Sequence, residues 1–186
     1  MQDINYGQMM TGSVVTGVQN TPNVKANAEV ENGEYIKFPD GSVAKALGER
    51  HEKGGINLIL PNMTEVLSNT NDLTISKDIV KTLKKDYDMN NVSTDDTYSK
   101  VLDKYARKIG YSKILQEEED LFNQVKKNTE NALSDGSRNI NNQYLAQKIY
   151  KLQQDKVPLQ GELSGMFDKL LEHNKQVKVK MSKLYL

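Results

Sequence analysis

Residues 28–68 read AEVENGEYIKFPDGSVAKALGERHEKGGINLILPNMTEVLS, and this stretch sets the fold that we expect for the chain. Three short runs within it are rich in β-forming residues: residues 34–38, 42–46 and 56–60. They are separated by Pro-Asp-Gly at residues 39–41 and by a glycine-containing segment at residues 48–55, both of which have the composition of turns. The pattern predicts a small antiparallel β-module over residues 28–75, in which the first two runs form a β-hairpin.

Residues 1–27 precede this module and are rich in Gly, Asn, Gln, Thr and Val, with charges only at Asp3 and Lys25. Because the segment lacks helical periodicity, we expect an extended N-terminal arm. Two interpretations stay open: a terminus without a role, or an arm that adds a strand to a neighbouring subunit or lies along it. The apolar residues favour the second interpretation. The candidate contact residues of this arm are Val14, Val15 and Val18.

The apolar period changes from two to about 3.6 at Ser76, so residues 76–186 are expected to be mainly α-helical. Ser76 is the expected N-cap of the first helix. A second helix is expected to start at Thr94 or Asp95 and to end at Gly110. The fold class predicted by these patterns is therefore α+β, with an N-terminal arm, a small β-module and a helical C-terminal half.

Further helices are expected along the rest of the chain. In the helix expected over about residues 112–134, Phe122 is placed on the apolar side and the acidic run 117–120 on the solvated side. A fourth segment, residues 139–156, is expected to end at the Val-Pro pair 157–158, after which another helix starts. These helices have narrow apolar stripes and suit a bundle or coiled coil that other chains complete.

The last expected helix carries the strongest amphipathic stripe. The candidate contacts with other subunits on this stripe are Leu163, Phe167 and Leu170. Residues 175–186 are basic and alternate apolar residues with lysines, which predicts either a strand or a partner-binding tail. Contact with packaged nucleic acid is considered only for the lysines of this tail: Lys175, Lys178, Lys180 and Lys183.

The composition limits the classes of function. Only 37% of the 186 residues are hydrophobic, and the mean hydropathy is −0.68, so the core is expected to be thin. Lys+Arg and Asp+Glu balance at 25 each, which gives no overall field that would drive nucleic-acid or membrane binding. The absence of cysteine excludes disulfides, thiolate chemistry and cysteine-based zinc sites. The start of the chain lacks a signal-peptide pattern and no apolar run has the length of a membrane span, so we expect neither export by a signal peptide nor a transmembrane helix.

No motif in the sequence assembles a catalytic site, and we expect no enzyme, no cofactor and no metal. His51, between two glutamates, is a candidate base or metal ligand, but a hydrogen bond that orders the glycine loop is the favoured interpretation. His173 is expected to be solvated or in an interface. The acidic pair 95–96 is interpreted as a helix start, since the spacing of a calcium-binding loop is missing. Phosphate-binding, dinucleotide-binding and nucleophile-elbow patterns do not occur.

A combined pattern in the β-module resembles a segment of proteins from tailed bacteriophages that infect Bacteroidetes, notably the crAss-like phages. The matching residues are Glu29, Glu31, Gly33, Glu34, Pro39 to Gly41, His51, Gly54, Gly55, Pro61, Thr64, Glu65, Val66 and Ser68. The resemblance covers about forty residues. It implies a component of the virion, located at the portal, tail or capsid, or cargo carried inside the particle, and it implies no cofactor and no catalytic residue.

Three hypotheses follow. The leading one is a non-enzymatic phage structural protein, made in the cytoplasm of the host bacterium, which oligomerises or docks on other virion subunits through its N-terminal arm and helical stripes. The second is a cargo protein that is packaged in the particle and ejected into the host. The third is an enzyme with a hydrolase or autoprocessing site near His51.

Overall fold

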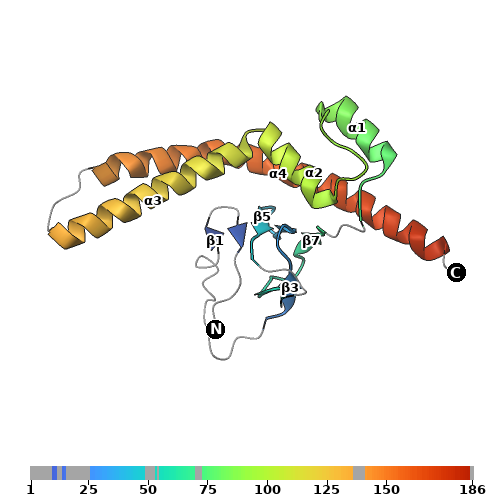
Figure 1. Ribbon diagram of the computed structural model, residues 1–186, viewed down its shortest axis with the longest axis horizontal. Helices are drawn as coiled ribbons and strands as arrows, with labels where there is room; N and C mark the ends of the chain where they lie inside the picture. The colour runs from blue at the N-terminus through green and yellow to red at the C-terminus, as the bar shows by residue number, and fades with distance from the viewer. Residues whose placement is uncertain are drawn as a thin grey trace.

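The computed structural model describes residues 10–11, 14–15, 26–48, 53, 55–69, 73–135 and 141–184. Within these residues, short β-strands come first and four helices follow, which confirms the predicted α+β class (Figure 1). Most of residues 1–27 lie outside the described part, so the extended arm stays a prediction. None of the described helices is long and apolar enough to cross a membrane.

The strands form two small sheets. The larger one has the order β1-β2-β5-β4-β7 and the smaller one pairs β3 with β6. The strands are β1 (Met10–Thr11), β2 (Val14–Val15), β3 (Ala28–Val30), β4 (Tyr35–Lys37), β5 (Val43–Ala46), β6 (Ile56–Leu58) and β7 (Glu65–Leu67). All pairs are antiparallel except that of β2 with β5, which is parallel.

The predicted β-hairpin is confirmed at β4 and β5. The Phe38 N–H donates to the Ser42 carbonyl at 2.9 Å, and Gly41 takes a φ of +85°, a conformation that glycine adopts without strain. The Asp40 carboxylate accepts hydrogen bonds from the Ser42 hydroxyl at 2.6 Å and the Ser42 N–H at 2.9 Å. These hydrogen bonds hold the pKa of Asp40 below its usual value, so the turn is stabilised by the ionised carboxylate.

Alternation along the strands gives the larger sheet two buried faces. Ile36 and Ala44 pack toward the smaller sheet in a cluster with Leu58 and other residues of β3 and β6. Their neighbours Tyr35 and Val43 belong to the main core, which is shared with the helices. The β-strands and the helical half therefore bury their apolar side chains together.

The helices are α1 (Lys77–Tyr87), α2 (Tyr98–Lys108), α3 (Tyr111–Asp135) and α4 (Asn141–Leu184). The predicted N-cap is confirmed, because the Ser76 hydroxyl accepts a hydrogen bond from the Ile79 N–H. The predicted start of the second helix at Thr94 or Asp95 is wrong. Thr97 caps α2 instead, and Asp96 before it is buried, accepting from the Ser93 N–H at 2.9 Å and pairing with Lys104 at 2.6 Å.

The predicted break at residues 157–158 is also wrong, because α4 continues through Pro158 as a helix of 44 residues. Pro158 removes one backbone N–H, which leaves the Gln154 carbonyl without its helical partner. The side chains of Gln154 and Pro158 are both exposed, so this side of the helix faces water. The helix is held together by the packing of Leu159 and of the residues before Pro158. The strand considered for residues 175–186 is wrong as well, since the backbone is helical as far as Leu184, and the partner-binding tail stays a prediction.

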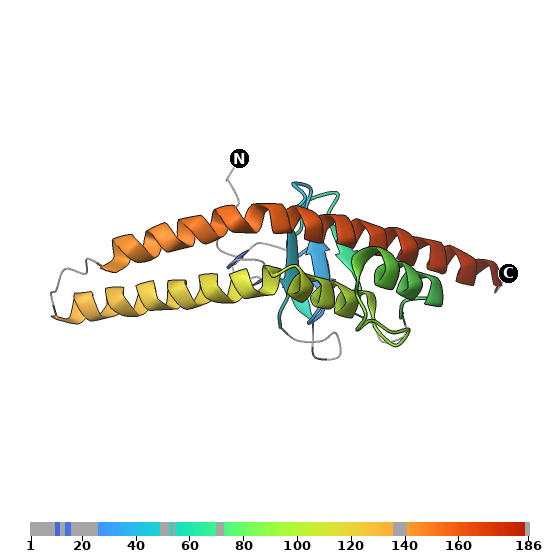
Figure 2. The same cartoon turned by 90° about the horizontal axis from the view of Figure 1, so that it is seen from above.

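Helix α4 is the axis of the molecule. Its C-terminal half packs against α2 and the larger sheet, while its N-terminal half lies antiparallel beside α3 (Figures 1 and 2). We call α3 together with residues 141–157 of α4 the helical hairpin. Figure 1 shows that this hairpin extends away from the β-strands, with α1 on the other side of the molecule.

Candidate functional site

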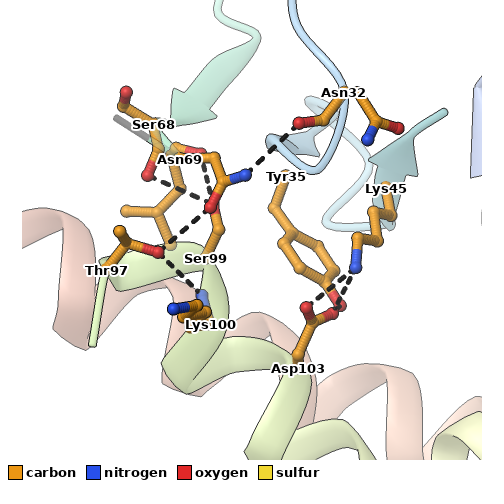
Figure 3. A network of polar contacts seen from close by, with 10 residues as sticks. Asn32, Tyr35, Lys45, Ser68, Asn69, Thr97, Ser99, Lys100 and Asp103 are labelled. Atoms are coloured by element: carbon orange, nitrogen blue, oxygen red, sulfur yellow. Dashed lines mark hydrogen bonds and ion pairs between the residues drawn. The ribbon is translucent and has the colours of Figure 1, made fainter. Parts of the chain in front are cut away.

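A network of polar contacts joins the larger sheet to α2 (Figure 3). Tyr35 on β4 donates its hydroxyl proton to the Asp103 carboxylate at 2.6 Å. Lys45, opposite Tyr35 on β5, contacts both oxygens of the same carboxylate at 2.7 and 2.8 Å. Both strands are therefore attached to one residue of α2.

This network is suited to holding the sheet in place and not to acid–base chemistry. Burial raises the pKa of Tyr35 far above its ordinary value, and the negative charge of Asp103 raises it further. The phenol therefore stays protonated at neutral pH and remains a hydrogen-bond donor. Lys45 neutralises the carboxylate that accepts this bond.

A second set of contacts in Figure 3 joins the end of β7 to the start of α2. The Thr97 hydroxyl donates to the Asn69 side chain at 3.0 Å, and the Asn69 amide donates to the Asn32 carbonyl at 3.3 Å. The buried Ser99 hydroxyl lies within hydrogen-bond distance of the carbonyls of Leu67 and Ser68. These short polar side chains satisfy backbone groups where the strand meets the helix.

The histidines do not form a site in the described residues. His51 lies outside them. His173 is partly buried, with Nδ1 at 2.8 Å from the Tyr98 hydroxyl and Nε2 at 3.1 Å from the Ser76 hydroxyl, so the expectation of a solvated side chain is wrong, and a role in an interface stays a prediction. His173 thus connects α4 to the N-terminal end of α1 and to that of α2. Among the residues that the structure describes, no group of three or more His, Asp or Glu could hold a metal ion.

The helical hairpin is built on a seven-residue repeat that interlocks α3 with α4. The contact positions, which we call the hairpin seam, are spaced alternately by three and four residues. On α3 they are Tyr111, Ile114, Glu118, Leu121, Val125, Asn128 and Ala132, and on α4 they are Asn142, Leu145, Ile149, Leu152, Lys156, Leu159 and Leu163. All of these side chains are buried or half-buried.

Two polar pairs lie inside this seam. Glu118 and Lys156 form an ion pair at 2.6 Å, with side-chain exposures of 5% and 19%. Nearer the tip, the Asn128 amide donates to the Asn142 side-chain oxygen at 3.4 Å. The prediction that the acidic run 117–120 forms a solvated face is therefore wrong at Glu118, which faces α4.

Four of the five large apolar side chains that are exposed on the described part of the hairpin lie on one side of it, and Tyr144 (56% exposed) lies on the other. Each of these four follows a seam residue by one position: Phe122 (49% exposed) and Leu133 (82%) on α3, and Tyr150 (63%) and Val157 (69%) on α4. Two antiparallel helices are related by a two-fold axis perpendicular to their common plane, so these positions face the same way on both helices. We call this surface the hairpin face. Phe122 was expected on the packed side of its helix, and that expectation is wrong.

Charge is distributed unevenly around the hairpin. The positions of α4 that follow each seam residue up to Val157 carry no charge: Gln143, Ala146, Tyr150, Gln153 and Val157. The positions that precede each seam residue carry Lys148, Lys151 and Asp155. On α3, the hairpin face includes Glu119 and Lys126. A surface depleted in charge and containing exposed aromatic residues has the composition of a protein–protein interface.

The hairpin face continues the side of α4 that the larger sheet covers. Three contacts join successive positions of α4 to successive strands of the sheet. Nearest the C-terminus, Lys175 pairs with Glu65 of β7, and Asp168 pairs with Lys37 of β4. Nearest the N-terminus, the Gln160 amide donates to the Val43 carbonyl of β5. Gln160 also follows a seam residue by one position. The next such residue is Val157, where the sheet no longer covers the helix.

The interaction residues predicted from the sequence lie elsewhere. Leu163, Phe167 and Leu170 have 0% exposure in the main core, where they pack on the chain's own elements. The backbones of Val14 and Val15 form β2, and Val18 lies outside the described residues. Sequence reasoning missed Tyr150 and Val157, which the seven-residue repeat of α4 would have placed beside the seam.

Comparison with known proteins gives no match to a family model, a curated protein or a solved structure. The function is therefore argued from the hairpin face and from the residues of the β-module.

Proposed function

We propose that this chain is a non-enzymatic structural protein of a tailed-bacteriophage virion, and that it docks on neighbouring portal, tail or capsid subunits with the hairpin face. The observation that carries the proposal is the uncovered, charge-depleted surface around Tyr150 and Val157 on a hairpin that extends beyond the β-strands. Burying such apolar side chains against a neighbour is favourable by about 25 cal/mol per Å² of apolar area.

The shape of the molecule supports a connecting role. At about 1.5 Å per residue, a helix with the length of α4 spans about 65 Å, much longer than a domain of this size needs for its own core. One half of α4 is committed to the main core through residues such as Leu163 and Phe167. The other half is available to reach a second subunit.

The resemblance of residues 28–68 to a segment of crAss-like phage proteins provides the biological setting. In this setting the β-module and the hairpin act as two attachment points of one virion component. The Tyr35–Asp103–Lys45 network then keeps the β-module fixed to α2.

Cross-linking of washed particles of the phage that encodes the chain tests the proposal. We expect an amine-reactive reagent to join Lys126, an exposed residue of the hairpin face, to other virion proteins. Lys77 and Lys81 on α1 are exposed matched controls on the other side of the molecule. Absence of the chain from particles, or cross-links confined to α1, would overturn the proposal. Loss of the chain from particles after DNA ejection would replace it by the cargo hypothesis.

A further inference from the structure

We infer that the partner of the hairpin face is the same face of a second copy of this chain, so that two helical hairpins associate into an antiparallel four-helix bundle. This inference rests on the proposed function, since it names one subunit on which the hairpin docks. The chemistry of the face is its starting point. The α4 part of the face, with its uncharged Tyr, Val and Gln side chains, can face the same part of a second copy without repulsion between like charges.

The β-module restricts the direction of pairing. The sheet covers the same side of α4 from Gln160 onward, so two hairpins that met in parallel would bring their sheets together at one end. An antiparallel arrangement places the two sheets at opposite ends of the bundle. The two-fold axis then lies between the two faces and perpendicular to the helices, and each α3 stacks on the α3 of the other copy.

The position of the two-fold axis along the hairpin follows from the two polar pairs of the seam, which we call its polar layers. The Glu118–Lys156 and Asn128–Asn142 contacts place Phe122 at about the same level of the hairpin as Tyr150, between the two layers. An axis through this level brings the exposed aromatic residues of both copies to the centre of the interface. Aromatic residues at the centre of an interface contribute most to its affinity.

The charges on α3 are complementary in this arrangement. Glu119 precedes Phe122 by three residues and Lys126 follows it by four, so an antiparallel pair of α3 helices centred on Phe122 places Glu119 opposite Lys126 of the partner subunit. The two-fold axis generates this ion pair twice. Both side chains are exposed in the single chain.

The area of the face indicates a weak dimer. The hairpin beyond the sheet is about 25 Å long at 1.5 Å per residue and about two helix diameters, or about 20 Å, wide. Pairing therefore buries roughly 500 Å² per copy and roughly 1,000 Å² in total, at the lower limit of specific interfaces. The dimer is expected to depend on concentration in solution and to be favoured by the high local concentration inside an assembly.

Sedimentation equilibrium over a concentration series tests the inference, with helicity by circular dichroism as a check of folding. We expect wild type to show a monomer–dimer equilibrium and Tyr150→Glu to weaken it by about tenfold or more. Tyr144→Glu is the matched control, because Tyr144 is similarly exposed on the same helix but precedes a seam residue. We expect this control to dimerise like wild type.

A charge exchange adds a result that general destabilisation cannot imitate. Glu119→Lys and Lys126→Glu are each expected to weaken the dimer, and the double variant is expected to restore it. A wild type that stays monomeric at its highest soluble concentration would overturn the inference, as would a dimer that Tyr150→Glu leaves intact. If the monomeric chain still cross-links to other virion proteins through its hairpin, the proposed function stands alone. If the dimer forms but particles lack the chain, the proposed function fails while the dimer stands.

Discussion

Replacing Lys156 by methionine is the sharpest test of how the helical hairpin is held together. Lys156 is the partner of Glu118 inside the seam, and methionine keeps a long, helix-compatible side chain while removing the positive charge. The variant leaves the Glu118 carboxylate between the two helices without its counter-ion. The expected loss of stability therefore measures an unpaired buried charge and not a change of volume.

The magnitude follows from the burial of the two side chains. Removing one partner of a fully buried ion pair costs about 3–5 kcal/mol. Glu118 is 5% and Lys156 19% exposed, so water reaches part of the pair, and we expect about 2–3 kcal/mol for Lys156→Met. Glu118→Met is expected to cost less, about 1–2 kcal/mol, because the flexible stem of Lys156 lets its ammonium group move toward solvent. The free energy of unfolding of the double variant is expected to lie within about 1 kcal/mol of the wild-type value or to exceed it.

Urea unfolding followed by far-ultraviolet circular dichroism gives these free energies, at a protein concentration low enough to keep the chain monomeric. Lys113→Met is the matched control in α3, because Lys113 pairs with Glu117 at 3.7 Å on the exposed side. We expect the control to change the free energy of unfolding by less than about 0.5 kcal/mol. A Lys156→Met variant as stable as Lys113→Met would refute the assignment of Glu118 and Lys156 to the seam.

Two further predictions concern Tyr35 and Pro158. Burial, with Asp103 adding to it, raises the pKa of Tyr35 above that of the unfolded chain, so its contribution to stability is complete below about pH 10 and is lost as the pH rises further. In urea unfolding, the free energy of unfolding of Tyr35→Phe should therefore fall less between about pH 10 and pH 11 than that of wild type. An equal fall in both proteins would contradict the burial of the phenol. Pro158→Ala should stabilise the chain by about 2 kcal/mol in urea unfolding, by restoring a helical hydrogen bond at the Gln154 carbonyl. A destabilised variant would show that the packing on both sides depends on a bend at Pro158.

The sequence was sufficient to predict those parts of the fold that depend on residues close together in the chain. The Pro-Asp-Gly turn specified the β4–β5 hairpin, because Gly41 supplies the positive φ and Asp40 the side-chain acceptor. Ser76 specified the start of α1 for the same kind of reason, since its hydroxyl caps the nearby Ile79 N–H.

The errors came from residues whose partners are distant in sequence. Glu118 looked like one of four solvated acids, and only its contact with Lys156 on the other helix shows why it is buried. Pro158 was expected to end a helix, because the preference of proline for the first turn of a helix takes no account of the packing on both sides of it. His173 connects to Tyr98 and Ser76, which precede it by 75 and 97 residues. The hairpin face itself could have been predicted, had the polar seam residues been accepted as members of the seven-residue repeat.

The two polar layers explain how a long, thin hairpin keeps a defined face. If α4 slipped by seven residues along α3, Glu118 would lie against Ile149 or Leu163 and Lys156 would lose its carboxylate, so the slipped states carry an unpaired buried charge. Replacing the ion pair with apolar residues removes this penalty and leaves only the Asn128–Asn142 pair to distinguish the correct register from the slipped ones. Only the correct register keeps Phe122 level with Tyr150. The ion pair at the base of the hairpin thus fixes the positions of the exposed aromatic residues on which docking depends.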